Sequence, residues 1–223
     1  MSISRLFADD TSLTCFASNV NDIEGILNHD LDMVSTWSKQ WRVSFNQTKT
    51  EAILFSNQNV QNPSLLFDNV NITFVHNHKH LGLTLNKHGK WKVQITNITK
   101  SASKVLGIMR SLKFVLRRES LNQIYVSFLR PILEYVSVVW DNCTVAENDS
   151  LEPEAARIVT GTTRSITLNN LYTEIGWLSL ADRRTYQKPF TLLILLTDWH
   201  QPIYVQFTQM PLAIVHITLF GMH

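Results

Sequence analysis

The spacing of apolar residues changes near Lys90, and this change constrains the fold of the 223-residue chain more than any other feature. Before it, short runs such as Val70–Phe74 alternate between apolar and polar residues and are separated by turn residues, which is typical of strands joined in hairpins. After it, apolar residues recur at three- and four-residue steps, which indicates amphipathic helices. The sequence therefore predicts an α+β fold, in which a mixed strand-and-helix part, residues 1–90, precedes an all-helical part, residues 91–188.

The first part is predicted to contain one long helix among short strands. Asn19 or Asn21 can cap this helix, and Glu24 stands where the capping-box partner of Asn21 would be. Its acidic residues, Asp30 among them, are predicted to face solvent, and the helix should end near Arg42. Its apolar stripe is Ile23, Leu27, Leu31, Val34, Trp37 and Trp41. Strands are predicted at 50–55, 65–67, 70–74 and 80–85.

The second part is predicted to begin with a long helix from Trp91, followed by another from Glu119 that ends where Pro131 starts a new turn. Shorter helices are predicted at 154–160, 168–172 and 180–186. From 189 to 223 the chain has one acidic residue, no Lys or Arg and no sustained period. We expect this segment to be an atypical tail, frame-shifted or disordered, unless 190–197 forms an apolar helix.

Composition excludes several classes of protein. The chain is 44% hydrophobic, which is enough for a sizeable core. Two cysteines, Cys15 and Cys143, exclude a disulfide scaffold and are too few for a zinc finger, and they fit a reducing compartment. The start of the chain shows no secretion signal, and the apolar segment 203–220 is broken by Pro211. We therefore expect an intracellular protein, nuclear or cytoplasmic, that neither is secreted nor spans a membrane.

The charges of the chain are sorted along it, although the net charge is only +2. No acidic residue occurs between Asp68 and Glu119, whereas this interval contains Lys79, Lys87, Lys90, Lys92, Lys100, Lys104, Arg110, Lys113, Arg117 and Arg118. Such segregation indicates a polyanionic partner, because Lys and Arg bind phosphates and release their counterions. The alternative is a solvated helix face, but such a face normally interleaves both signs. Nucleic acid is therefore the favoured partner.

Two adjacent carboxylates, Asp9 and Asp10, lie between an apolar run ending at Phe7 and another ending at Phe16. This pattern predicts two strands and a tight turn, with the carboxylates at the tip of a hairpin. Carboxylates held against an apolar layer need a cation, and sites that transfer phosphoryl groups use them to hold divalent ions. Asp-Asp is also an ordinary turn dipeptide. The residues alone leave both interpretations open.

Three histidines, His76, His78 and His80, alternate along a segment predicted to be extended. On a strand they would share one face and could chelate zinc or copper. No second cluster of ligands accompanies them, and solvated or phosphate-contacting histidines are the alternative.

Several stretches occur in a specific order: Phe7–Asp10, then Trp41–Phe55 with its segment Phe45–Glu51, then His78–Leu83 followed by Trp91. Later stretches are Arg130–Tyr135 up to Trp140, Glu154–Gly161, and Leu171–Trp177 up to Arg184. The first group resembles the C-terminal palm motifs of the reverse transcriptases of non-LTR (LINE-type, jockey-like) retrotransposons, and the second resembles their thumb and connector. The resemblance covers residues 6–188.

The resemblance implies a partial polymerase palm at 1–90, built of antiparallel hairpins and a helix, and a helical thumb at 91–188. It implies that Asp9 holds a catalytic metal ion with Asp10 in support, and that the complete enzyme uses two Mg²⁺ or Mn²⁺ ions. Lys49 would protonate the pyrophosphate leaving group, although a lysine at the entrance of a strand can also be a solvated surface charge. The residues in the position of the primer grip are His80, Leu81 and Gly82.

The resemblance also implies an RNA template, a DNA primer and deoxynucleoside triphosphates as partners. The thumb residues expected to contact the duplex are Lys100, Lys104, Arg110, Lys113, Arg117 and Arg118. A palm needs a further metal-binding aspartate on an upstream strand, which this sequence lacks, so we expect no polymerase activity from the chain alone. A non-catalytic nucleic-acid-binding remnant is the alternative function, and an unfolded relic is a third. Pro153 is expected to break the helix that leads into Glu154.

Overall fold

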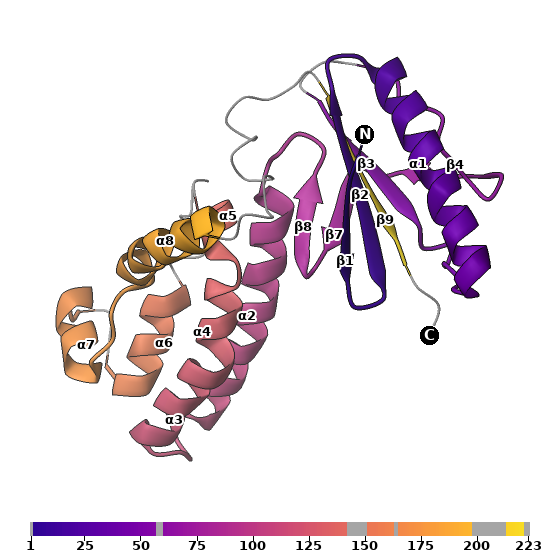
Figure 1. The fold of residues 1–223 in the computed structure, drawn as a ribbon. Helices are drawn as coiled ribbons and strands as arrows, with labels where there is room; N and C mark the ends of the chain where they lie inside the picture. Colours follow the sequence, from indigo (N-terminus) through magenta and orange to yellow (C-terminus); the bar gives the residue numbers. More distant parts are fainter. Residues whose placement is uncertain (1, 57–59, 142–150, 163–164, 198–212, 221–223) are drawn as a thin grey trace. The chain divides into compact units, whose positions relative to one another are not determined.

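The computed structural model describes residues 2–56, 60–141, 151–162, 165–197 and 213–220. Their helices and strands form an α+β fold, as predicted from the sequence (Figure 1). The chain divides into two compact units. One unit combines Met1–Lys90 with Ile203–His223, and the other is Trp91–Pro202. No helix in the described part of the chain is both long and apolar enough to cross a membrane.

The first unit is built on a five-stranded sheet in the order β1-β2-β9-β3-β6. Neighbouring strands are antiparallel except β3 and β6, which are parallel. The strands are β1 (Ile3–Phe7), β2 (Asp10–Ala17), β9 (Ala213–Leu219), β3 (Glu51–Phe55) and β6 (Thr73–Phe74).

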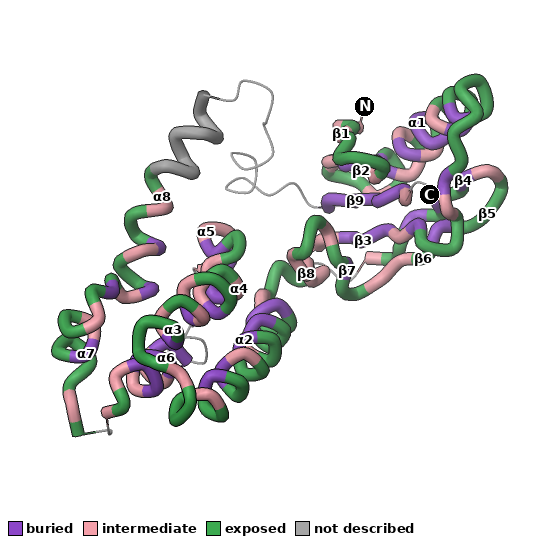
Figure 2. Tube along the Cα trace, turned by 90° about the horizontal axis from the view of Figure 1, so that it is seen from below, coloured by how far each residue is buried: buried purple, intermediate pink, exposed green. Residues whose placement is uncertain are grey.

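The strand β9 differs most from the sequence prediction, which expected no strand between 189 and 223. It lies between β2 and β3, and all seven of its residues are buried (Figures 1 and 2). The strand does alternate, because Val215, Ile217 and Leu219 face the core whereas His216 and Thr218 face the other side, and the sequence prediction missed this short period of two. The preceding helix α8 (Leu180–Thr197) also runs past Lys188, with Pro189 inside it.

One face of the sheet packs on the helix α1 (Val20–Trp41) (Figure 1). Alternate sheet residues point to this face, and with the helix they form the hydrophobic core. The core members from the sheet and the helix include Leu13, Cys15, Val215, Ile217, Ala52, Leu54, Ile23, Leu27 and Leu31. Burial raises the pKa of the Cys15 thiol, which keeps it neutral. Cys143 lies outside the described residues.

The first and last residues of α1 agree with the prediction, but the exposure of some of its side chains does not. The side chain of Asn19 caps the helix by accepting the N–H of Asn21 at 3.0 Å, whereas Glu24 accepts the N–H of Ser64 at 2.8 Å instead of closing a capping box. Trp41, expected in the buried stripe, is 65% exposed. Asp30, expected in solvent, is buried and accepts the N–H of Ser2 at 3.0 Å. The N–H of Ser2, just before β1, provides a hydrogen-bond partner for this carboxylate, so its burial is tolerated.

The predicted hairpin at 65–74 is confirmed as β4 (Leu66–Phe67) and β5 (Val70–Asn71). Its turn residues, Asp68 and Asn69, both have positive φ, as a two-residue turn of type I′ requires. The prediction of a single strand at 80–85 had the wrong bounds. The structure has a second hairpin, β7 (Asn77–His80) and β8 (Leu83–Asn86).

The helical unit begins with α2 (Lys92–Leu112) and α3 (Arg118–Ile124). The expectation that Pro131 starts a new turn was wrong, because the helix continues through a π-helical segment, η1 (Tyr125–Leu129), into α4 (Arg130–Glu134). A π-helical segment widens the helix locally, so a proline that cannot donate an N–H is accommodated just after it. The remaining helices are α5 (Ser137–Trp140), α6 (Leu151–Thr160) and α7 (Leu168–Ile175).

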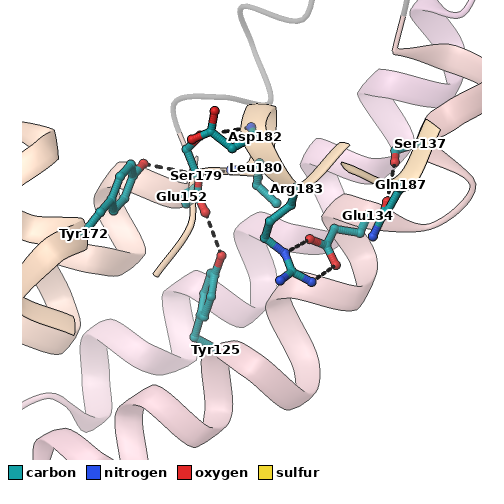
Figure 3. A network of polar contacts seen from close by, with 10 residues as sticks. All are labelled: Tyr125, Glu134, Ser137, Glu152, Tyr172, Ser179, Leu180, Asp182, Arg183 and Gln187. Atoms are coloured by element: carbon teal, nitrogen blue, oxygen red, sulfur yellow. Dashed lines mark hydrogen bonds and ion pairs between the residues drawn. The ribbon is translucent and has the colours of Figure 1, made fainter. Parts of the chain in front are cut away.

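The expectation that Pro153 breaks a helix was also wrong, because this residue lies in the first turn of α6, where the missing N–H has no intrahelical partner to lose. Next to it, the carboxylate of Glu152 is 3% exposed and connects four segments of the unit (Figure 3). It accepts hydrogen bonds from the Tyr125 hydroxyl at 2.9 Å, the Tyr172 hydroxyl at 3.2 Å and the Leu180 N–H at 2.9 Å.

Candidate functional site

The predicted acidic hairpin is formed by β1 and β2. Phe7 pairs with Asp10, so Ala8 and Asp9 form the turn between the strands. Ala8 has a φ of 52°, a region that residues with a Cβ rarely adopt, and such backbone outliers cluster at functional sites. Asp9 is exposed and Asp10 is half-buried. The carboxylates therefore lie at the tip of the hairpin, where a ligand could reach them.

The sheet register brings Asp10 and Lys49 to the same end of the sheet. On one side of β9, Thr11 pairs with Leu219, and on the other side Glu51 pairs with Thr218. Asp10 is one residue beyond the first of these pairs and Lys49 is two residues beyond the second, so both lie toward the same end of the sheet. Lys49 is exposed, and its N–H donates to the Asn46 carbonyl at 3.2 Å within the turn that leads into β3.

The sheet face opposite α1 is polar. Rows of paired residues cross β2, β9 and β3, and residues two apart on a strand share a face. One row contains Ser12, Thr218 and Glu51, and the next contains Thr14, His216 and Ile53. Asp10 shares this face with Ser12. The acidic hairpin and the strand that follows Lys49 thus contribute to one polar surface.

The carboxylates of Asp9 and Asp10 suit Mg²⁺ or Mn²⁺, which prefer oxygen ligands. Mg²⁺ is commonly held by one or two carboxylates, with waters and substrate phosphates as its other ligands. Two adjacent carboxylates fit one such ion. Within the described residues, the group of three possible ligand side chains that lie close together consists of histidines, not of these carboxylates.

The residues of the predicted primer grip form the turn between β7 and β8. His80 pairs with Leu83, and Leu81 and Gly82 between them have φ values of 46° and 80°. Gly82 adopts this conformation without steric cost, because it has no Cβ. His80 is half-buried, and Leu81 is exposed. The expected backbone turn is therefore present at these residues.

The histidine cluster differs from the one considered from the sequence. His78 and His80 lie together with His216 of β9, whereas His76 is exposed and not part of the group. Candidate ligand atoms of the three rings lie within 4.8 Å of one another. Sequence reasoning missed His216 because nothing local marks a residue whose strand pairs with segments far away in the chain.

Burial is the main cause of the altered acidity of two of these rings. It lowers the pKa of His216 to about 3, and the charges of His80, His78 and Arg5 act in the same direction. Burial, followed by the charge of His78, also lowers the pKa of His80, while the carboxylate of Asp10 opposes this shift. Both imidazoles are therefore neutral near pH 7.

The predicted basic residues divide into two groups in the structure. Lys100 and Lys104 are exposed one turn apart on α2, and Lys113 and Arg117 are exposed in or beside the connection to α3. Arg110 instead forms an ion pair with Glu154, with its Nε donating to Oε1 at 2.9 Å.

Arg118 likewise pairs with Glu174, with 2.7 Å between Nη1 and Oε1. These acidic partners lie far away along the chain, so the apparent segregation of charge in the sequence overstated the free positive charge of the folded unit.

Comparison with known proteins gives one similarity in sequence. Over 132 residues the chain is 27% identical to the RNA-directed DNA polymerase from mobile element jockey of Drosophila melanogaster. The matched segment is 58% of this chain but only 14% of that protein. No family model matches the chain, and no solved structure matches it. The similarity to the jockey polymerase confirms the resemblance predicted from the sequence motifs, to a fragment of a jockey-like non-LTR retrotransposon reverse transcriptase.

Proposed function

We propose that this chain is the palm end and thumb of an RNA-directed DNA polymerase, and that it supports two-metal nucleotidyl transfer only together with further parts of such an enzyme. The observation that carries the proposal is the position of Asp9 and Asp10 at a hairpin tip, with Lys49 at the same end of the same sheet. In this proposal the carboxylates hold Mg²⁺ against the triphosphate, and Lys49 donates a proton to the leaving pyrophosphate. The turn His80–Gly82 positions the primer.

An apolar groove beside the hairpin supports a role within a larger assembly. It lies between β1 and α1, encloses about 790 Å³, and is lined by Leu6, Ile26, Met33 and Trp37 among others. Leu6, Met33 and Trp37 are exposed, and a group of exposed apolar side chains favours a protein partner. Because the jockey polymerase is much longer than the matched segment, we propose that other parts of a polymerase cover this groove.

Primer extension tests the catalytic proposal. The isolated chain, given Mg²⁺, an RNA template, a DNA primer and deoxynucleoside triphosphates, should not extend the primer. A chimera in which the full chain, including β9, replaces the corresponding part of the jockey polymerase should extend it. In the chimera, Asp9→Ala should lower the rate at least about 100-fold, because a metal ligand is lost.

Asp22→Ala, which removes an exposed carboxylate from the first turn of α1, is the matched control and should leave the rate of the chimera unchanged. An active chimera that tolerates Asp9→Ala would refute the role of the hairpin. Extension by the isolated chain that Asp9→Ala abolishes would overturn the claim that the chain is inactive alone.

A second candidate function is non-catalytic binding of a nucleic-acid duplex. Lys100 and Lys104 favour it, because they project into solvent from one helix and can neutralise phosphates without reading bases. Arg110 and Arg118 contribute less in this scheme, because Glu154 and Glu174 already neutralise them.

The salt dependence of duplex binding tests whether Lys100 and Lys104 contribute more to binding than Arg110 and Arg118 do. For a labelled RNA–DNA duplex followed by fluorescence anisotropy between about 50 and 200 mM salt, Lys100→Gln with Lys104→Gln should reduce the slope of log K against log salt by about 2. The paired control, Arg110→Gln with Arg118→Gln, should change the slope by less than half as much. Absent or salt-independent binding by the wild-type chain would contradict the duplex-binding function.

A further inference from the structure

Three imidazole rings meet on the polar face of the sheet, and the acidic hairpin does not account for them. His78 and His80 come from β7, and His216 comes from β9. The ring centroids of His80 and His216 are 4.9 Å apart, and those of His78 and His216 are 5.8 Å apart. His78 and His216 are buried, and His80 is half-buried. Histidines gathered at this spacing are a donor set for a metal ion.

The hydrogen bonds around the rings direct Nε2 of His78 and Nε2 of His216 toward the hydroxyl oxygen of Thr218. Glu51 lies 3.1 Å from Nδ1 of His78, and because a carboxylate only accepts, this nitrogen carries the hydrogen and Nε2 carries the lone pair. Nε2 of His78 is 2.9 Å from the hydroxyl oxygen of Thr218, and Nε2 of His216 is 3.3 Å from the same oxygen. This hydroxyl can donate its one hydrogen to Nε2 of His78, and Nε2 of both rings therefore lies beside the same oxygen.

The outer partners resemble the supporting groups of metal-bound histidines. A ligating histidine usually donates its second N–H to a carboxylate or another acceptor, which fixes the tautomer and the ring orientation. Glu51 provides such an acceptor for His78, and the Thr14 hydroxyl lies 2.8 Å from Nδ1 of His216.

We propose that His78, His80 and His216 form a three-histidine site for a divalent transition metal, with Zn²⁺ as the physiological ion. Imidazole nitrogen favours Zn²⁺, Cu²⁺ or Ni²⁺ over Mg²⁺, so this site is chemically distinct from the carboxylates of Asp9 and Asp10. Tetrahedral zinc with bonds of 2.0–2.1 Å needs ligand nitrogens about 3.4 Å apart. The candidate ligand nitrogens now lie within 4.8 Å of one another, so they must move closer together to bind the ion.

His80 is the ring best placed to make this adjustment. It is half-buried and precedes the Leu81–Gly82 turn, whereas His78 and His216 are held by Glu51 and Thr14. Its partial exposure also leaves room for water as the fourth ligand. A bound ion would join the β7–β8 hairpin to β9, and because an ion that binds only the folded chain stabilises it, zinc would stabilise this unit. This inference does not depend on the polymerase proposal.

Metal titration of the full chain, produced without a polyhistidine tag and stripped with a chelator, tests the site. Zn²⁺ as its sulfate is added in competition with a chromogenic chelator, and Co²⁺ is used as a spectroscopic substitute. We expect one equivalent of tightly bound Zn²⁺, visible absorption of tetrahedral Co²⁺, and a raised melting temperature with Zn²⁺. His80→Ala should weaken Zn²⁺ binding at least about 100-fold, and Glu51→Gln should weaken it about tenfold.

His76→Ala is the matched control, because His76 is an exposed histidine just before β7 and should not affect binding. His80→Ala removes a half-buried side chain beside a turn, so its circular dichroism spectrum should match that of the wild type. His216→Ala should also abolish the Co²⁺ absorption. The site is refuted if Zn²⁺ does not bind the wild-type chain, if His80→Ala binds as tightly as the wild type, or if His76→Ala weakens binding equally.

Discussion

Val215→Asp is expected to destabilise the sheet unit by at least about 5 kcal/mol, because it places a carboxylate without a partner in a closed core. Val215 lies in the middle of β9, is fully buried, and pairs with Cys15 on one side and Leu54 on the other. The strand lies between β2 and β3, so its loss would also separate these strands from each other. The sheet unit should then lose its cooperative unfolding.

Hydrogen exchange followed by mass spectrometry provides the measurement, since peptides covering β2 and β3 report on this sheet alone. In Val215→Asp both peptides should exchange rapidly, while peptides from α3 and α6 keep their protection. Val215→Thr is the matched control. It keeps the branched shape and should cost only about 1–2 kcal/mol. If β2 and β3 stay protected in Val215→Asp, then β9 does not pair between them in solution.

Glu152→Ala is expected to destabilise the helical unit by about 4 kcal/mol. The substitution removes the acceptor of three hydrogen bonds, and each buried donor left without a partner costs about 1–3 kcal/mol. The donors are Tyr125, Tyr172 and the Leu180 N–H, so contacts with η1, α7 and the start of α8 weaken together (Figure 3). Tyr125 also stacks on Trp177, with ring centroids 3.6 Å apart, and this packing depends on the position of its hydroxyl end.

Urea unfolding monitored by hydrogen exchange of α3 and α6 measures this effect. Glu152→Gln keeps a carbonyl acceptor and should cost no more than about 1 kcal/mol near pH 7. Burial raises the pKa of Glu152 above its ordinary value of 4.5. The folded chain thus holds the proton more tightly than the unfolded chain, so the stability of the wild type declines as pH rises from 4.5 through the raised pKa.

The Gln variant lacks this carboxyl group, so its free energy of unfolding should rise relative to that of the wild type across this pH interval. If Glu152→Ala and Glu152→Gln are equally stable, then acceptance of these hydrogen bonds does not hold the helices together.

Much of the fold was predictable because local residue patterns decide it. The period of apolar residues predicted α1 and α2, and Asn19 marked the start of α1. The strands predicted at 65–67 and 70–74 leave only Asp68 and Asn69 between them, and both residues adopt the positive φ that a two-residue hairpin turn requires. The Phe7–Asp10 segment predicted the acidic hairpin for a similar reason, since two apolar runs flank a two-residue turn.

The errors have a common cause, which is that tertiary contacts changed what a local pattern meant. Trp37 and Trp41 continued an apolar stripe, but the stripe is fully buried only as far as Leu31, and both tryptophan rings are exposed. Pro153 was expected to break a helix, yet it lies in the first turn of α6, next to Glu152, which accepts hydrogen bonds from tyrosines of two other elements. Pro131 was expected to begin a new turn, and a π-helical segment accommodates it instead.

The sequence by itself determined the α+β class, the order of the motifs that resemble a reverse transcriptase, and the hairpin that carries Asp9 and Asp10. These features depend on residues close together in the chain. Only the tertiary structure decided that Lys49 lies at the same end of the sheet as Asp10, and that His216 joins His78 and His80. Both results depend on how β9 pairs with strands far away in the sequence, and the register of such pairs follows from burying one face of the whole sheet against α1.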